Sequence, residues 1–133
     1  MKTDVEVRQD IYKYIMASEL HGRNGVTGTI GYQGRADGAK TEDCIISILD
    51  NVNGQIQDCD VNVNIYVQNI NSGGRSVENV SRTKALSKLA ETVLNSGYGD
   101  SFRFELRKQR ILQVQGKDEY VINNKLRYKQ FNS

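Results

Sequence analysis

The segment from Gln57 to Asn69 alternates between apolar and polar residues more strictly than any other part of this 133-residue chain. One set holds Cys59 and every second residue to Val67, and the other holds Asp60 and every second residue to Gln68. Successive side chains of a β-strand point to opposite faces. The pattern therefore predicts a strand in a sheet with one face on the core and the other in water.

This strand is predicted to form a hairpin with a second strand at residues 41–50. Asn53-Gly54 lies between the two, and this dipeptide is the strongest short hairpin signal. If Asn53 and Gly54 are the two turn residues, Ile46 faces Val61, and the apolar faces of the two strands coincide.

A second hairpin is predicted from strands Ser101–Gln115 and Glu119–Phe131, joined by the loop residues 116–118. In that register Leu106 faces Tyr128 and the apolar faces again coincide. In the middle, however, polar residues fall on the apolar face, so a bulge is expected there, or else the ribbon projects beyond the core. The polar residues concerned are Lys108, Arg110 and Asn124.

Two helices complete the pattern. Residues 4–17 have apolar residues at helical spacing, and Thr3 with Glu6 fits a capping box. A second helix is expected from Ser76 or Val77 to Asn95, with Gly97 as its C-cap. The sequence thus predicts a single α+β domain over residues 1–133: a four-stranded antiparallel sheet of two hairpins, two helices on one face, and the order α-(loop)-β-β-α-β-β.

Residues 22–40 contain half of the 12 glycines and are predicted to form a mobile surface loop, with a short strand near residues 29–32. Residues 34–41 resemble a phosphate-binding loop, which offers a nucleotide-binding alternative. Ala39 separates Gly38 from Lys40, however, and a strand pattern follows where that motif requires a helix. The surface-loop interpretation is therefore preferred.

The residues that usually carry catalysis are scarce. His21 is the sole histidine. In the predicted hairpin Cys44 faces Val63, about 13 Å along the strand from Cys59, which is too far for a disulfide. A nuclease with Asp100 and Glu105 as its acidic pair is an alternative, but ordinary alternation of charges along a strand accounts for both. We expect no enzyme, no metal and no cofactor.

The net charge of +2 conceals an uneven distribution. Residues 1–60 hold 6 basic and 10 acidic residues, whereas residues 103–133 hold 8 basic and 3 acidic residues. A basic hairpin could bind nucleic acid, while an acidic front and a basic back suit head-to-tail self-association. The candidate self-assembly surface comprises Arg103, Arg107, Lys108, Arg110, Lys125, Arg127, Asp37, Glu42 and Asp43.

Four stretches carry a family resemblance: 10–15 in the first helix, 38–40 with 44–48 entering the first hairpin, 85–90 in the second helix, and 102–105 with 126–129 in the last hairpin. With this order of elements the chain resembles the tail-terminator or tail-completion proteins of long-tailed bacteriophages and prophages. The resemblance implies a non-enzymatic minor tail protein that forms a ring, commonly a hexamer, at the end of the tail tube.

Further expectations follow from the resemblance. The partners would be other copies of the chain, tail-tube proteins and head-connector proteins, with neither membrane nor nucleic acid among them. The protein would be found in the host cytoplasm and then in the virion tail. The alternative hypothesis is a nucleic-acid-binding module that uses the basic C-terminal hairpin.

Overall fold

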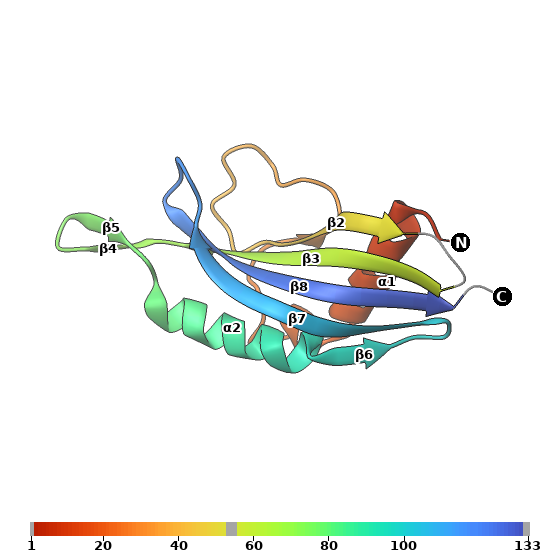
Figure 1. Cartoon of the computed structure of the whole chain (residues 1–133). Coiled ribbons are helices and arrows are strands. Elements are labelled where there is room, and N and C mark those ends of the chain that lie inside the picture. The colour runs from red at the N-terminus through yellow and green to blue at the C-terminus, as the bar shows by residue number, and fades with distance from the viewer. Residues whose placement is uncertain (1, 53–55, 132–133) are drawn as a thin grey trace.

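The computed structural model describes residues 2–52 and 56–131. Six strands form one curled sheet in the order β1-β2-β3-β8-β7-β6 (Figure 1). Strands β1 and β2 are parallel and the other neighbours are antiparallel, so the sheet is mixed. Its strands are β1 Ile30–Gly31, β2 Cys44–Val52, β3 Ile56–Gln68, β6 Ser96–Tyr98, β7 Phe102–Gln113 and β8 Glu119–Phe131.

The predicted four-stranded antiparallel sheet was therefore wrong, although the α+β class is confirmed. Two further strands complete the sheet. β1 confirms the short strand predicted near residues 29–32, which pairs with β2, whereas β6 has only three residues and is too short for alternation to reveal it. Gly97, the predicted helix C-cap, instead lies in β6 opposite Phe104. A Cβ atom at Gly97 would come within 2.5 Å of the Phe104 ring, so this edge strand needs glycine to approach β7.

Helices α1 (Asp4–Met16) and α2 (Val80–Leu94) cover the apolar face of the sheet, and a single 3-10 turn spans Glu19–His21. The capping box is confirmed: the Glu6 N–H donates to Thr3 Oγ1 at 3.3 Å, and the Thr3 N–H donates to Glu6 Oε1 at 3.1 Å. Neither helix is long and apolar enough to cross a membrane.

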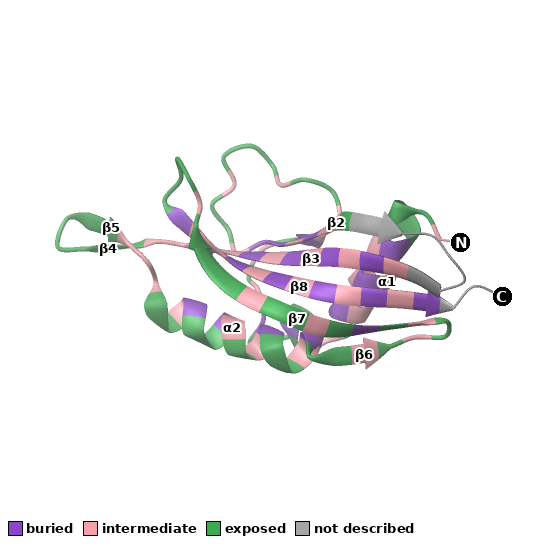
Figure 2. Ribbon diagram, in the orientation of Figure 1, coloured by how far each residue is buried: buried purple, intermediate pink, exposed green. Residues whose placement is uncertain are grey.

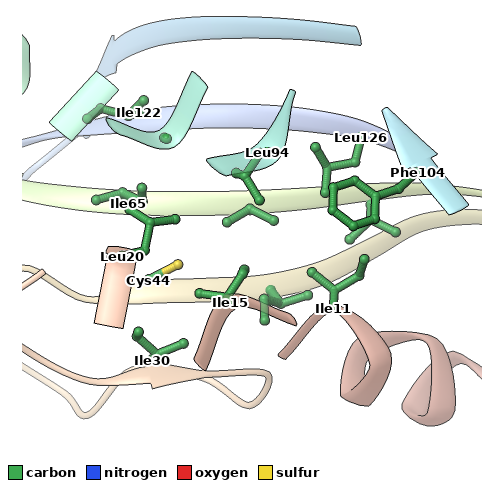
Figure 3. Close-up of a cluster of buried hydrophobic side chains, with 14 of the residues drawn as sticks. Ile11, Ile15, Leu20, Ile30, Cys44, Ile65, Leu94, Phe104, Ile122 and Leu126 are labelled. Atoms are coloured by element: carbon green, nitrogen blue, oxygen red, sulfur yellow. The ribbon is translucent and has the colours of Figure 1, made fainter. Parts of the chain in front are cut away.

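Side chains from both helices and from the sheet meet in one core (Figure 3). Ile11 and Ile15 of α1 face the sheet, and in this view Leu94 of α2 lies to the left of Leu126 and Phe104 of the last hairpin. The apolar set of the alternating segment, from Cys59 to Val67, is buried as predicted. Burial alternates along β3 and β8 in the same way (Figure 2).

The register of the first hairpin differs from the prediction by two residues. Ile46 lies opposite Val63 rather than Val61, and a bulge follows between Ile48 and Asp50. A shift of two leaves every side chain on its original face, so the apolar pattern cannot distinguish the two registers. The predicted Asn53-Gly54 turn lies outside the described residues.

The register of the second hairpin was also wrong: Leu106 lies opposite Leu126 rather than Tyr128. The predicted bulge is confirmed, between Leu106 and Lys108. The extra residue moves Lys108 to the open face of the sheet, opposite Lys125. The loop is also longer than predicted, because β7 ends at Gln113.

A separate two-stranded hairpin, β4 (Ile70–Ser72) with β5 (Arg75–Val77), projects beyond one end of the sheet (Figure 1). We call residues 70–77 the arm. Gly73 and Gly74 form its turn, both with positive φ, a conformation that glycine adopts without steric cost. The second helix was predicted to begin at Ser76 or Val77, but both residues belong to β5 and α2 begins at Val80.

Candidate functional site

The open face of the sheet carries the polar half of the alternating pattern and most of the predicted candidate residues. Pairing between strands arranges these side chains in rows that cross the sheet. Three regions follow one another along the face: a cluster around Arg35, a patch of lysine and arginine, and a corner beside β6.

At one end, the glycine-rich segment folds over the open face and is fastened there by Arg35. Its guanidinium donates to Asp43 Oδ2 at 2.9 Å and to Glu119 Oε1 at 2.9 Å, and it lies 4.1 Å from the centroid of the Tyr66 ring. It also donates to the carbonyl oxygens of Ala39 and Thr41. We call Arg35, Asp43, Tyr66 and Glu119 the Arg35 cluster.

Both carboxylates of the Arg35 cluster are buried and receive further hydrogen bonds. Asp43 Oδ1 accepts from the Thr29 N–H and from the Thr41 hydroxyl, each at 2.8 Å, and Glu119 Oε2 accepts from Gln68. Burial by itself would raise the pKa of Asp43, but these hydrogen bonds and the Arg35 charge outweigh it and hold that pKa below its usual value. The cluster is thus an internal ionic anchor for the segment.

Glu42 anchors the same segment to α2. Its carboxylate receives two hydrogen bonds from the Arg82 guanidinium, at 2.6 and 2.8 Å, and Arg82 also donates to the Gly25 carbonyl at 2.7 Å. The Gly28 N–H donates to the Glu42 carbonyl at 2.8 Å, and a Cβ atom at Gly28 would come within 2.3 Å of Asp43 Oδ1. Glycine is therefore required where this segment passes the two acidic residues.

In the middle of the open face lies the basic patch, which we define as Lys108, Arg110 and Lys125. Lys108 and Lys125 are directly opposite each other on β7 and β8, and Arg110 follows two residues along β7. None of the three forms an ion pair or a side-chain hydrogen bond with another described residue. Like charges directly opposite one another destabilise a sheet, so the patch opposes folding.

In the rows that contain the basic patch, the next side chains across the sheet are asparagines. Lys125 is followed by Asn62 on β3, and Arg110 is followed by Asn123 on β8 and Asn64 on β3. The Asn123 amide nitrogen donates to Asn64 Oδ1 at 2.7 Å and to Asn62 Oδ1 at 3.3 Å. The side-chain oxygens of Asn62 and Asn64 thus each accept a hydrogen bond from Asn123, whereas their side-chain N–H groups have no partner among the described residues.

The corner beside β6 is charged as well, but there the charges are balanced. Arg127 lies 3.3 Å from Asp58 and 3.9 Å from Asp60, and Lys129 lies opposite Asp58. Glu105 lies opposite Arg127 and forms an ion pair with Arg107 at 3.4 Å. An open pocket of about 890 Å³ occupies this corner, lined by Tyr14, Ser96, Gly97, Tyr98, Arg103, Phe104, Glu105, Arg127 and Lys129.

The structure divides the predicted self-assembly surface. All six of its basic residues lie on β7 and β8, and at least Lys108, Arg110, Lys125 and Arg127 share the open face. Of the acidic residues, Glu42 and Asp43 form ion pairs within the chain, while Asp37 is exposed in the loop. The sequence analysis missed Arg35 and Glu119, which are 84 positions apart and carry no shared motif.

The residues considered for chemistry lie apart from one another. Cys44 and Cys59 are buried free thiols, and burial raises the pKa of Cys44 to about 12. His21 Nδ1 is 3.1 Å from the Met16 carbonyl oxygen. Within residues 2–52 and 56–131, no three histidine, cysteine or acidic side chains are grouped closely enough to hold a metal ion.

Tyr128, Asp10 and Lys2 form a short chain of polar contacts that begins in the core. The buried Tyr128 hydroxyl donates to Asp10 Oδ2 at 2.6 Å, and Lys2 forms an ion pair with the same carboxylate beneath Phe102. Burial, and next the Asp10 carboxylate, raise the pKa of Tyr128. These contacts fasten the middle of α1 to β8.

Comparison with known proteins adds no relative: no protein-family model and no curated protein matches the chain.

Proposed function

We propose that this chain is a non-enzymatic structural protein that self-assembles head-to-tail into a ring, of the kind formed by tail-terminator proteins. The observation that carries the proposal is the arm. Residues 70–76 are all exposed, and the arm stands clear of the sheet and of both helices (Figures 1 and 2). An isolated two-stranded hairpin is at best marginally stable in water, so a neighbouring molecule is its natural support.

The root of the arm is held firmly enough to present it in one direction. The Asn69 N–H donates to the Asp118 carbonyl at 2.9 Å, and Asn69 also donates to Ser76 across the base of the arm at 3.1 Å. Near the tip, the Gly74 N–H donates to Asn71 Oδ1 at 3.0 Å. Ile70, which is 47% exposed, offers an apolar side chain for a contact.

A surface able to receive the arm lies toward the opposite end of the molecule, at the β6 corner (Figure 1). Its pocket includes Tyr98, which is 81% exposed, the largest exposure among the exposed large hydrophobic residues described. Exposed tyrosines are typical anchors of protein interfaces. A contact between two different surfaces of the same chain is heterologous, and such contacts generate rings when the rotation closes.

The resemblance to tail-terminator proteins supplies the biological setting in this proposal. The ring would cap the tail tube and meet the head connector, with assembly in the host cytoplasm before incorporation into the virion. Glu42 and Asp43, which form ion pairs within the chain, are not part of the contact proposed here.

The test is the molar mass in solution, measured by light scattering after size exclusion at low and high protein concentration. We expect an oligomer for the unmodified chain and a shift toward monomer for Ile70→Asp and for Tyr98→Ser. Val5→Asp is the matched control, because Val5 is 45% exposed and belongs neither to the arm nor to the lining of the β6 pocket. A monomer at every concentration would overturn the proposal.

A further inference from the structure

We propose that the basic patch and its amide rows bind the phosphodiester backbone of a nucleic-acid duplex without reading its sequence. This inference goes beyond ring assembly and does not depend on it, because the basic patch shares no residue with the arm or with the lining of the pocket at the β6 corner.

The first observation is the excess of unbalanced positive charge. At the β6 corner the two rows Arg103-Lys129-Asp58 and Glu105-Arg127-Asp60 hold three cations and three carboxylates. The rows of Lys108, Arg110 and Lys125 hold three cations and no carboxylate. The residues in those rows on β2 and β3 are Ser47, Asn62, Ile45 and Asn64. Three cations packed together at a cost to the sheet are explained by an anionic partner that offsets their repulsion.

The second observation is the kind of hydrogen-bonding group presented. Lysine and arginine only donate, and the amide oxygens of Asn62 and Asn64 each already accept a hydrogen bond from Asn123. The surface therefore offers mainly donors, which suits an acceptor-only partner such as a phosphate oxygen. Phosphate and sugar contacts of this type make up half or more of the hydrogen bonds between proteins and DNA.

The third observation distinguishes a duplex from other polyanions. The basic patch contains no aromatic side chain, and Tyr66, the nearest aromatic residue along the open face of β3, is covered by Arg35. Proteins that bind single strands stack bases on exposed aromatic rings. Interfaces with proteins usually have an apolar centre, and Ile45 is the sole apolar residue in these two rows. A duplex backbone requires neither feature.

The spacing of the cations is compatible with a duplex. Lys108 and Lys125 are on neighbouring strands, about 5 Å apart, and Arg110 lies about 7 Å along β7. A duplex carries one negative charge per about 1.7 Å of its axis, so each cation can reach its own phosphate. Three contacts correspond to a salt-dependence slope of about −2.7, and so to about a 40-fold loss of affinity between 50 and 200 mM salt.

The experiment measures fluorescence anisotropy of a 20-base-pair duplex DNA, a duplex RNA, a single-stranded DNA and poly-glutamate at 50 and 200 mM NaCl. The patch variant combines Lys108→Gln, Arg110→Gln and Lys125→Gln. Its control removes the same charge from exposed residues elsewhere, through Lys40→Gln, Lys84→Gln and Lys88→Gln. Circular dichroism verifies that both variants are folded.

We expect the unmodified chain and the control to bind duplexes with a steep salt dependence, and the patch variant to lose about 2.7 units of slope. Binding of duplex DNA, duplex RNA or both supports the inference and identifies the source of the backbone. Equal slopes for the patch variant and the control would overturn it, as would no binding by the unmodified chain. Poly-glutamate or single-stranded DNA binding more tightly than either duplex would also overturn it and identify a different partner.

Discussion

The arginine and lysine side chains on the open face of the sheet lie in two opposite environments, one with paired charges and one without. In the Arg35 cluster a single cation, whose side chain is 11% exposed, lies between two carboxylates and an aromatic ring. In the basic patch three cations are exposed or half-buried and have no partner among the described residues. The Arg35 cluster therefore stabilises this fold, whereas the basic patch is present although the repulsion between its like charges lowers stability.

The largest expected effect is on the Arg35 cluster. Arg35→Ala would leave two buried carboxylates without their cation, and we expect a loss of about 3 kcal/mol in the free energy of unfolding, measured with urea. Arg110→Ala is the control, because Arg110 makes no such contact. Equal stability of the two variants would show that the cluster anchors nothing.

The Arg35 cluster should also make the free energy of unfolding depend on pH, through Asp43. Because the pKa of Asp43 is lower in the folded state than its usual value, the stabilisation is complete at neutral pH and is lost as the pH falls through that lowered pKa. Urea unfolding between pH 7 and pH 3 measures it. In Asp43→Asn the loss on acidification should be smaller, and an unchanged pH profile would contradict this account.

A smaller effect is expected at the other end of the protein, where Tyr128 meets Asp10. Tyr128→Phe removes one buried hydrogen bond to a charged group, so we expect a loss of about 1.5 kcal/mol in the free energy of unfolding. Because the pKa of Tyr128 is higher in the folded protein than its usual value, the contribution of Tyr128 to the free energy of unfolding declines at strongly alkaline pH. Tyr98→Phe, at an exposed ring, serves as the control in the same urea titration.

The smallest effect has the opposite sign. Lys108→Glu replaces a repulsive pair with an attractive one opposite Lys125, so stability should rise by about 0.5 kcal/mol while duplex affinity falls. Lys84→Glu, on the exposed side of α2, controls for the change in net charge. A fall in stability on Lys108→Glu would mean that the basic patch carries no strain.

Much of the fold was predictable because it depends on periodicity. The alternation at 57–69 placed β3, and the Thr3–Glu6 capping box placed the start of α1. Register was not predictable, because a shift of two residues preserves the faces of a strand. The bulge beside Lys108 was inferred from polar residues on an apolar face, and the structure shows that it turns Lys108 outward.

The candidate site was less predictable than the fold. Its basic residues were evident from composition, but nothing in the sequence distinguishes the paired Arg127 from the unpaired Lys125. That distinction depends on Asp58 and Asp60, which reach Arg127 only when β3 pairs with β8. The role of the glycine-rich segment was hidden for the same reason, since Arg35 meets Glu119 only in the folded chain.

The sequence by itself determined the local structure of this protein: two amphipathic helices, four long strands and a sheet with one wet face. These follow from the spacing of apolar residues, which each segment carries alone. Only the tertiary structure decided which charges are neutralised and which stay open, and that the arm stands clear of the body. Those properties depend on contacts between segments far apart in the chain. Strand register and bulges, rather than residue type, decide which side chains of those segments meet.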